Sequence, residues 1–329
     1  MARRDPARRG AAPGAPAAAP APGAPQAPAP GPRGYSWLAN PRETRAVLES
    51  YGHSAVHALG QNFLVDDSVI GRILGLAELT RGDAVLEVGP GIGTLTVALL
   101  ERAGAVVAVE ADRSLAPVLA ETCASDSERL ALVLGDALRV GEGRIAEELA
   151  SLGVAGVPAL PDKLVSNLPY QVAATLVLKV LSEMPSVGRI VVMVQAEVAD
   201  RISAAPGSRA YGAYTAKLAL LGRVTGRFEV GPGCFMPAPH VDSAVVRIDR
   251  APVPGPDGAP LGPDELAACA RVIDAAFAQR RKTIRNSMGA SGFDKAALDA
   301  AFAEVGIDPT SRAERLAPAD FVRLAGSLS

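Results

Sequence analysis

Five short apolar segments, each followed by a helical segment, constrain the fold of this chain more than any other feature of its sequence. They are AVLEV (84–88), AVVAVE (105–110), LALVL (130–134), KLVSN (163–167) and RIVVMVQ (189–195). Apolar strands that alternate with helices predict a parallel sheet covered on both faces, because each strand must then be buried on both sides. The pattern therefore predicts an α/β fold.

Two further segments predict how the sheet ends. RVTGRFEV (223–230) and SAVVRIDR (243–250) favour a pair of strands that forms an antiparallel edge, which brings the expected sheet to seven strands. Before the sheet, NPRETRAVLESYG predicts a helix that has Asn40 as its N-cap, Pro41 at the first position and Glu43 at the capping-box position.

The two ends of the chain differ in composition from the α/β region. Residues 1–35 are rich in Ala, Pro, Gly and Arg and cannot form a core, so we expect a disordered tail. Residues 251–263 are rich in Pro and Gly and predict a linker. Residues 264–329 contain only helical patterns and predict a small all-helical domain, with one continuous helical pattern over 265–288.

Composition excludes several classes of protein. No run of 18 apolar residues is present, so no membrane span is expected. The three cysteines and three histidines are too few and scattered for a disulfide framework or a metal site, and His53 and His57 lack the Glu of a zinc-protease helix. We therefore expect no metal, and a reducing cytoplasm. Because the net charge is −2, nucleic-acid binding would require positive charge concentrated in patches.

The glycine-rich turn after the first strand predicts a cofactor site. Gly89, Gly91 and Gly93 stand at alternate positions, which lets a ligand approach the backbone at the carboxyl edge of the sheet. Glu110 ends the second strand, where a carboxylate can accept hydrogen bonds from both hydroxyls of a ribose. Asp136 follows the third strand, where it can accept from an adenine amino group. The set predicts a cofactor that carries adenosine.

The spacing of the glycines favours S-adenosylmethionine over NAD. The NAD fingerprint is G-x-G-x-x-G, with a pyrophosphate on the helix N-terminus, whereas this turn is G-x-G-x-G. Glu87 precedes the turn by two residues. A carboxylate is poorly placed beside a pyrophosphate but suits the sulfonium and ammonium of S-adenosylmethionine. An NAD-dependent oxidoreductase is the alternative, although no hydride-transfer acid is evident.

The segment NLPY follows the fourth strand and is expected at the same edge of the sheet. Methylating an exocyclic adenine amine requires a nitrogen lone pair that is otherwise delocalised into the ring. Acceptors on both N–H bonds would free it, and the Asn167 side chain and the Leu168 backbone carbonyl are the candidates. Pro169 stiffens the turn, and Tyr170 offers a face on which a base can stack. Catalysis would then depend on positioning and electrostatics. The alternative is an ordinary turn that ends a strand.

Eight motifs resemble the bacterial 16S rRNA adenine-N6 dimethyltransferases, also called the kasugamycin-resistance dimethyltransferase family. They are GQNFL (60–64), LEVGPGIGTLT (86–96), VAVE (107–110), GDAL (135–138), SNLPYQVAATL (166–176), VVMVQAEVADRI (191–202), FMPAPHVDSAVVRI (235–248) and FAQRRKTIRNSM (277–288). The resemblance covers about residues 36 to 329 and implies a Rossmann-like class I methyltransferase domain over 36–250. It also implies an RNA-binding role for the helical domain over 264–329.

The resemblance implies roles for individual residues. Asn62 and Leu64 would close over the methionine part of S-adenosylmethionine, and Gly89 would line it. Asn167 would touch both the cofactor and the target. Phe235 would stack on the flipped adenine together with Tyr170; the alternative for Phe235 is a core aromatic.

One basic cluster is the candidate RNA contact. Four cations lie in a stretch without acids, in what we expect to be a basic helix, and the resemblance implies that they dock RNA; they are Arg280, Arg281, Lys282 and Arg285. Arg201 and Arg209, after the fifth strand, add to the positive charge. The alternative is a solvated helix face.

The resemblance implies a substrate and leaves two related alternatives. The implied substrate is two adjacent adenosines near the 3′ end of 16S rRNA, within the immature small ribosomal subunit, which the protein would dimethylate. We expect the protein to act as a monomer. A macrolide-resistance enzyme would instead modify 23S rRNA with the same chemistry, but NLPY and FAQRRKT favour the 16S enzyme. An assembly factor that acts mainly by binding is the other alternative, and the intact NLPY argues that chemistry is retained.

Overall fold

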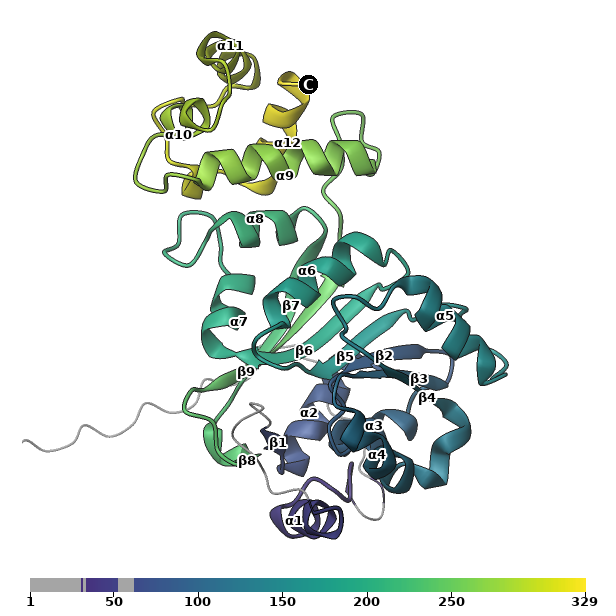
Figure 1. Cartoon of the computed structure of the whole chain (residues 1–329). Coiled ribbons are helices and arrows are strands. Elements are labelled where there is room, and N and C mark those ends of the chain that lie inside the picture. Colours follow the sequence, from purple (N-terminus) through teal and green to yellow (C-terminus); the bar gives the residue numbers. More distant parts are fainter. Residues whose placement is uncertain (1–30, 32–33, 53–61) are drawn as a thin grey trace, which may run out of the picture.

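A seven-stranded mixed sheet forms the centre of this computed structural model, which describes residues 31, 34–52 and 62–329 (Figure 1). The strands lie in the order β4-β3-β2-β5-β6-β9-β7. Their bounds are β2 (Ala84–Val88), β3 (Ala105–Glu110), β4 (Leu130–Leu134), β5 (Lys163–Asn167), β6 (Arg189–Gln195), β7 (Gly222–Val230) and β9 (Ser243–Arg250). The first five are parallel, and β9 runs antiparallel to both β6 and β7. The predicted α/β sheet with an antiparallel edge is confirmed.

The sheet opens where β2 meets β5. The two strands pair only at Val85 and Leu86, so they separate toward their carboxyl ends. There the buried Ser166 hydroxyl donates to the Val88 carbonyl and bridges the gap. The chain crosses from one half of the sheet to the other between β4 and β5, and such a switch point opens a crevice at the carboxyl edge. This crevice holds the candidate site.

Helices cover both faces of the sheet. One face packs against α2 (Asp67–Ala77), α3 (Thr94–Leu100) and α4 (Ala116–Thr122). The other face packs against α5 (Glu142–Ser151), α6 (Ala173–Glu183), α7 (Ala196–Ile202) and α8 (Ala213–Ala219). Short 3-10 turns complete this region: η2 (Arg113–Leu115), η3 (Ala124–Arg129) and η4 (Pro232–Cys234). Burial on both faces explains why the parallel strands are almost entirely apolar.

Two short strands lie beside the carboxyl edge of the sheet. They are β1 (Phe63–Leu64) and β8 (Phe235–Met236), which pair antiparallel. The helix α1 (Pro41–Ser50) lies nearby (Figure 1). Its predicted N-cap is confirmed, because the Asn40 side chain accepts from the N–H groups of Arg42 and Glu43. The Asn40 N–H donates to the Leu38 carbonyl, in place of the capping-box bond expected from Glu43.

The C-terminal region is helical and packs on α8. It consists of α9 (Pro263–Phe277), α10 (Ile284–Ala290), α11 (Lys295–Val305), the 3-10 turn η5 (Ala313–Arg315) and α12 (Pro318–Ser327). Apolar side chains of α9 and α12 belong to the same core cluster as α8 and the sheet. The buried Tyr211, which precedes α8, donates its hydroxyl to the Leu316 carbonyl. The N–H of Gly207 donates to the carbonyl of Glu314 in η5.

The continuous helical pattern predicted over 265–288 is wrong. The helix α9 ends at Phe277, and a turn separates it from α10. The buried Ser287 stabilises this corner, because its hydroxyl donates to the Ala275 carbonyl and accepts from the Gln279 N–H. Thr283 caps α10 by accepting from the Asn286 N–H. The expected basic helix is therefore mainly a basic turn.

Some expectations fall on residues that the structure does not describe, namely most of the tail over 1–35, the pair His53 and His57, and the start of GQNFL. Within the described ranges, no helix has the length and apolar character needed to cross a membrane. In the same ranges, no group of three or more His, Cys, Asp or Glu side chains is placed to hold a metal ion.

Candidate cofactor and target site

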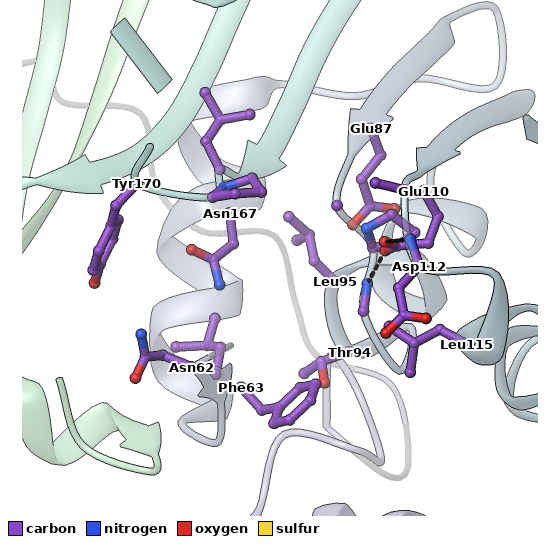
Figure 2. Close-up of a pocket in the computed structure, with 17 residues that line it drawn as sticks. Asn62, Phe63, Glu87, Thr94, Leu95, Glu110, Asp112, Leu115, Asn167 and Tyr170 are labelled. Carbon is purple, nitrogen blue, oxygen red and sulfur yellow. Dashed lines mark hydrogen bonds between the residues drawn. The ribbon is translucent and has the colours of Figure 1, made fainter. Parts of the chain in front are cut away.

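A cavity of about 260 Å³ opens at the carboxyl ends of β2, β3 and β5 (Figure 2). Four segments that are distant in sequence form its walls. The lining residues are Asn62, Phe63, Leu64, Glu87, Gly89, Pro90, Gly91, Thr94, Leu95, Glu110, Ala111, Asp112, Leu115, Asn167, Leu168, Pro169 and Tyr170. The glycine turn, Glu110 and NLPY thus share one cavity, as the sequence predicts.

The glycine turn packs directly against NLPY. Gly89 has a φ of +70°, and a Cβ placed there would lie 3.0 Å from Cγ of Pro169. A larger residue at this position would be strained and would push the two loops apart. The close contact places the cofactor turn beside the segment that would hold the target.

Glu110 is held rigidly across the glycine turn. One carboxylate oxygen accepts from the Asp112 N–H at 2.8 Å, and the other accepts from the Gly91 N–H at 3.3 Å. A carboxylate has about four acceptor positions, so these backbone bonds leave acceptor capacity for a ligand. Burial raises the pKa of Glu110, and the backbone N–H groups oppose that rise. This geometry suits a carboxylate that accepts from the two hydroxyls of a ribose.

Glu87 is a buried acid with an unsatisfied oxygen at the cavity. Its side chain is only 1 % exposed, and its Oε2 has no hydrogen-bond partner within the described residues. Burial raises the pKa of Glu87 to about 8, and the nearby charge of Glu110 adds to the rise. A cation beside this carboxyl would stabilise its charged form. The cavity therefore fits a cationic adenosine ligand such as S-adenosylmethionine.

The raised pKa of Glu87 predicts how stability and cofactor affinity change with pH. The folded protein keeps this proton up to about pH 8, whereas the unfolded chain loses it near 4.5. The stabilisation is thus complete below about pH 4.5 and is lost as the pH rises to about 8. Relative to Glu87→Gln, the wild-type free energy of unfolding without cofactor should fall over this range in urea denaturation.

The affinity for S-adenosylmethionine should show the opposite trend. Because the cation favours ionised Glu87, binding releases a proton, and affinity should rise with pH by up to about tenfold per unit below pH 8. Calorimetry in buffers of different ionisation enthalpy measures this proton release. The same release in Glu87→Gln would show that another group supplies the proton.

The segment NLPY is anchored by backbone bonds. The Leu168 N–H donates to the Met193 carbonyl of β6, and the Val172 N–H donates to the Pro169 carbonyl. Asn167, the last residue of β5, and Tyr170, in the loop that follows, both line the cavity (Figure 2). The Tyr170 hydroxyl lies 2.7 Å from Oγ of the buried Ser243. An amide at the end of β5 and an aromatic ring in the anchored loop that follows therefore border the cavity together.

Two residues predicted for the site do not line the cavity. Asp136 is exposed, and its side chain accepts from the Leu138 N–H at 2.9 Å. Phe235 is only 5 % exposed and packs in the core next to β1. Contact of Asp136 with adenine and stacking by Phe235 stay predictions.

Other residues line the cavity that the sequence did not single out. They are Phe63, Pro90, Thr94, Leu95, Ala111, Asp112 and Leu115. Asp112 carried a usable signal, because it is an acid two residues after Glu110 at the end of a strand. Phe63 lies between Asn62 and Leu64 in the GQNFL motif, and the predicted roles in that motif belong to these two neighbours.

The four cations of the basic cluster have different surroundings. The guanidinium of Arg280 donates to the carbonyls of Arg209 and Tyr211 and pairs with Glu314 at 3.3 Å. Arg285 pairs with Asp299 on α11. The other two, Arg281 and Lys282, are exposed and form no ion pair with a described residue. Arg280 and Arg285 thus have partners inside the protein, while Arg281 and Lys282 face solvent.

Two solved structures that share this fold are a 23S rRNA methyltransferase and a dimethyladenosine transferase. The 23S rRNA methyltransferase ErmE aligns with a TM-score of 0.60 and 25% identity, covering 81% of this chain and 99% of that one. A dimethyladenosine transferase from Plasmodium falciparum aligns with a TM-score of 0.64 and 22% identity, covering 80% and 95%. The sheet, the glycine turn and the carboxylate that ends β3 define a class I methyltransferase that uses S-adenosylmethionine.

Sequence comparison identifies the family within this class of methyltransferases. The family model described as Ribosomal RNA adenine dimethylase matches residues 52–329. Ribosomal RNA small subunit methyltransferase A of Rhodococcus opacus is 43% identical over 302 residues, which cover 91% of this chain and 97% of the relative. The protein of the same name from Nocardia farcinica is 42% identical over 297 residues, covering 89% and 96%. The chain belongs to the ribosomal RNA adenine dimethylase family.

Proposed function

We propose that this protein dimethylates the N6 amines of two adjacent adenosines near the 3′ end of 16S rRNA, within the immature small ribosomal subunit. The observation that carries the proposal is the contact between Gly89 and Pro169, because it sets the cofactor turn and NLPY side by side at one cavity. The relatives named as small-subunit rRNA methyltransferases support this choice of substrate.

The cofactor would occupy the part of the cavity between β1 and β3. Asn62, Leu64 and Gly89 would surround its methionine part, and Glu110 would accept from its ribose. When bound, S-adenosylmethionine supplies a methyl group on a positively charged sulfur. Glu87 lies at the same cavity and would stabilise that positive charge.

NLPY would hold and activate the target base. The adenosine must leave its stack to enter a cavity of this kind. Its ring would stack on Tyr170, and its N–H bonds would donate to the Asn167 side chain and the Leu168 carbonyl. The two acceptors draw the amine nitrogen toward a tetrahedral shape and make its lone pair available. Binding and orientation thus supply most of the catalysis.

The exposed cations Arg281 and Lys282 would dock the RNA. Replacing both with alanine should weaken binding to small-subunit particles and reduce the slope of log affinity against log salt by roughly 1.4 to 1.8, because each lost phosphate contact contributes about 0.7 to 0.9. Binding measured across a salt series tests this expectation.

The control for this pair removes two cations that already have acidic partners. They are Arg144, paired with Glu148, and Arg323, paired with Asp320. That double alanine variant should keep the wild-type salt slope. A loss of cofactor affinity with unchanged RNA binding in Arg281→Ala/Lys282→Ala would contradict the docking role.

Two other functions predict different results in cells. An enzyme for 23S rRNA would leave 16S rRNA unmodified, and an assembly factor would support ribosome assembly without chemistry. Mass mapping of both rRNAs should be compared in cells without the protein, with wild type and with Asn167→Ala. We expect the two 16S adenosines to be dimethylated only with wild type. Methylation that appears on 23S rRNA instead would reject the proposed substrate.

The same comparison separates catalysis from binding. Assembly that is normal with Asn167→Ala but defective without the protein would give the chain a binding role beside its chemistry. Because the substrate is ribosomal RNA, we propose that the protein acts in the cytoplasm, and that one copy serves each particle.

A further inference from the structure

Tyr170 is tied to a residue that lies outside the cavity. Its hydroxyl and Oγ of Ser243 are 2.7 Å apart, so one donates a hydrogen bond to the other. Ser243 is fully buried and is not among the residues that line the cavity. It therefore touches the phenol of Tyr170 without reaching a ligand in the cavity.

Ser243 is held firmly by the sheet. It is the first residue of β9, and its backbone pairs with Gln195 of β6 on one side and with Val230 of β7 on the other. The neighbouring Asp242 carbonyl also accepts from the Ala196 N–H. A side chain on a strand paired on both sides has little freedom, whereas Tyr170 lies in a loop after β5. The bond thus fixes a loop residue to the rigid sheet.

The position of the Tyr170 ring matters because a base in the cavity can stack only on a ring that lies directly beside it. A tyrosine side chain can rotate about two bonds, and fixing its hydroxyl oxygen restricts the first rotation, which moves the whole ring from one place to another. The oxygen lies on the axis of the second rotation, which only turns the ring about its own long axis. The main-chain bonds of Leu168 and Val172 hold the loop but leave the first rotation free.

We propose that Ser243 is a positioning residue for methyl transfer, whose hydroxyl holds the Tyr170 ring in the place where the target base stacks. The inference rests on the proposed function, because it assumes that a base occupies this side of the cavity. It assigns a role to the serine of FMPAPHVDS, a motif singled out in the sequence without a function for that residue.

The test is a double-mutant cycle with Ser243→Ala and Tyr170→Phe. Methyl transfer to immature small-subunit particles is measured for wild type, both single variants and the double variant at saturating cofactor. Each single change should lower kcat/KM for the particle by about 5- to 30-fold, the effect of losing one buried hydrogen bond. The double variant should lose no more than either single, because both changes remove the same bond.

Three further measurements separate positioning from other roles. Cofactor affinity should stay at the wild-type value in Ser243→Ala, since Ser243 does not reach the cavity. The shape of the pH–rate profile should be the same in Tyr170→Phe, because a positioning hydroxyl transfers no proton. As a matched control, Ser186→Ala removes a hydroxyl that donates to the Pro161 carbonyl at the opposite edge of the sheet, and it should leave activity unchanged.

The outcomes are distinct. Losses that multiply in the double variant, or full activity in Tyr170→Phe, would overturn the role of Ser243. Should Ser243→Ala fail to fold, Tyr170→Phe still tests the bond, because it leaves the strand unchanged. If the wild-type protein transfers no methyl group to the particles, the proposed function fails, and base stacking becomes the measurement for the same four proteins. An RNA that carries the fluorescent base 2-aminopurine at the target position loses fluorescence when that base stacks on Tyr170. This loss of fluorescence should be weakened equally in both single variants.

Discussion

Replacing Asn167 with alanine is expected to slow methyl transfer to small-subunit particles by about 100- to 1,000-fold, similar to removing one preorganised group that stabilises a transition state in other enzymes. The side chain extends into the cavity from the end of β5, where it would accept from one N–H bond of the target amine. Without that acceptor the nitrogen lone pair stays delocalised into the adenine ring. The rate at saturating cofactor is the measurement.

A comparison with Asn167→Asp sharpens this experiment. Aspartate keeps an acceptor oxygen at the same position, so its activity should lie between those of wild type and Asn167→Ala. Thermal unfolding should be similar for all three, because Asn167 lies at the end of its strand and its side chain lines the cavity. Full activity of Asn167→Ala would reject the proposed function of NLPY.

Replacing Glu110 with alanine should weaken binding of S-adenosylmethionine by about 10- to 150-fold, or roughly 1.5–3 kcal/mol, the range for one charge-assisted hydrogen bond. The carboxylate would contact the ribose directly, and it also fixes the N–H groups of Gly91 and Asp112. Its removal would therefore loosen the glycine turn as well. Calorimetry with the cofactor alone gives the affinity without any need for RNA.

The control for Glu110 is Glu128→Ala, which removes the same charge from an exposed position in η3. Its cofactor affinity should equal that of wild type. Unchanged affinity in Glu110→Ala, or tight binding of NAD by the wild-type protein, would contradict the assignment of this cavity to S-adenosylmethionine.

The sheet was predictable because burial on both faces leaves a clear mark on the sequence. The five apolar segments coincide residue by residue with β2 to β6, and their parallel arrangement follows from the helices between them. The end of α9 was not predictable, because the helical pattern continues through the sequence QRRK. The corner is stabilised by the buried Ser287, which accepts from the N–H of Gln279, eight positions earlier in the chain.

The site was predictable in its location more than in its details. Strand ends placed Glu110 and Asn167 at one edge, since parallel strands share the same direction. Sequence does not show which way a side chain turns, so Phe235, which packs into the core, could not be distinguished from Phe63, which lines the cavity. Nor does it show that Arg280 donates to the carbonyls of Arg209 and Tyr211 across the fold.

The bonds that join the C-terminal helices to the rest of the protein have a consequence for substrate choice. Tyr211, Arg280 and Gly207 link this region to the α/β domain, and the apolar core is continuous across the junction. The exposed turn at Arg281 and the cavity at Tyr170 are therefore held at a constant distance from each other. If RNA binds at this turn as proposed, an RNA that carries its adenosines at another distance from the bound segment would bind without being modified. The distance between the turn and the cavity would then select the substrate.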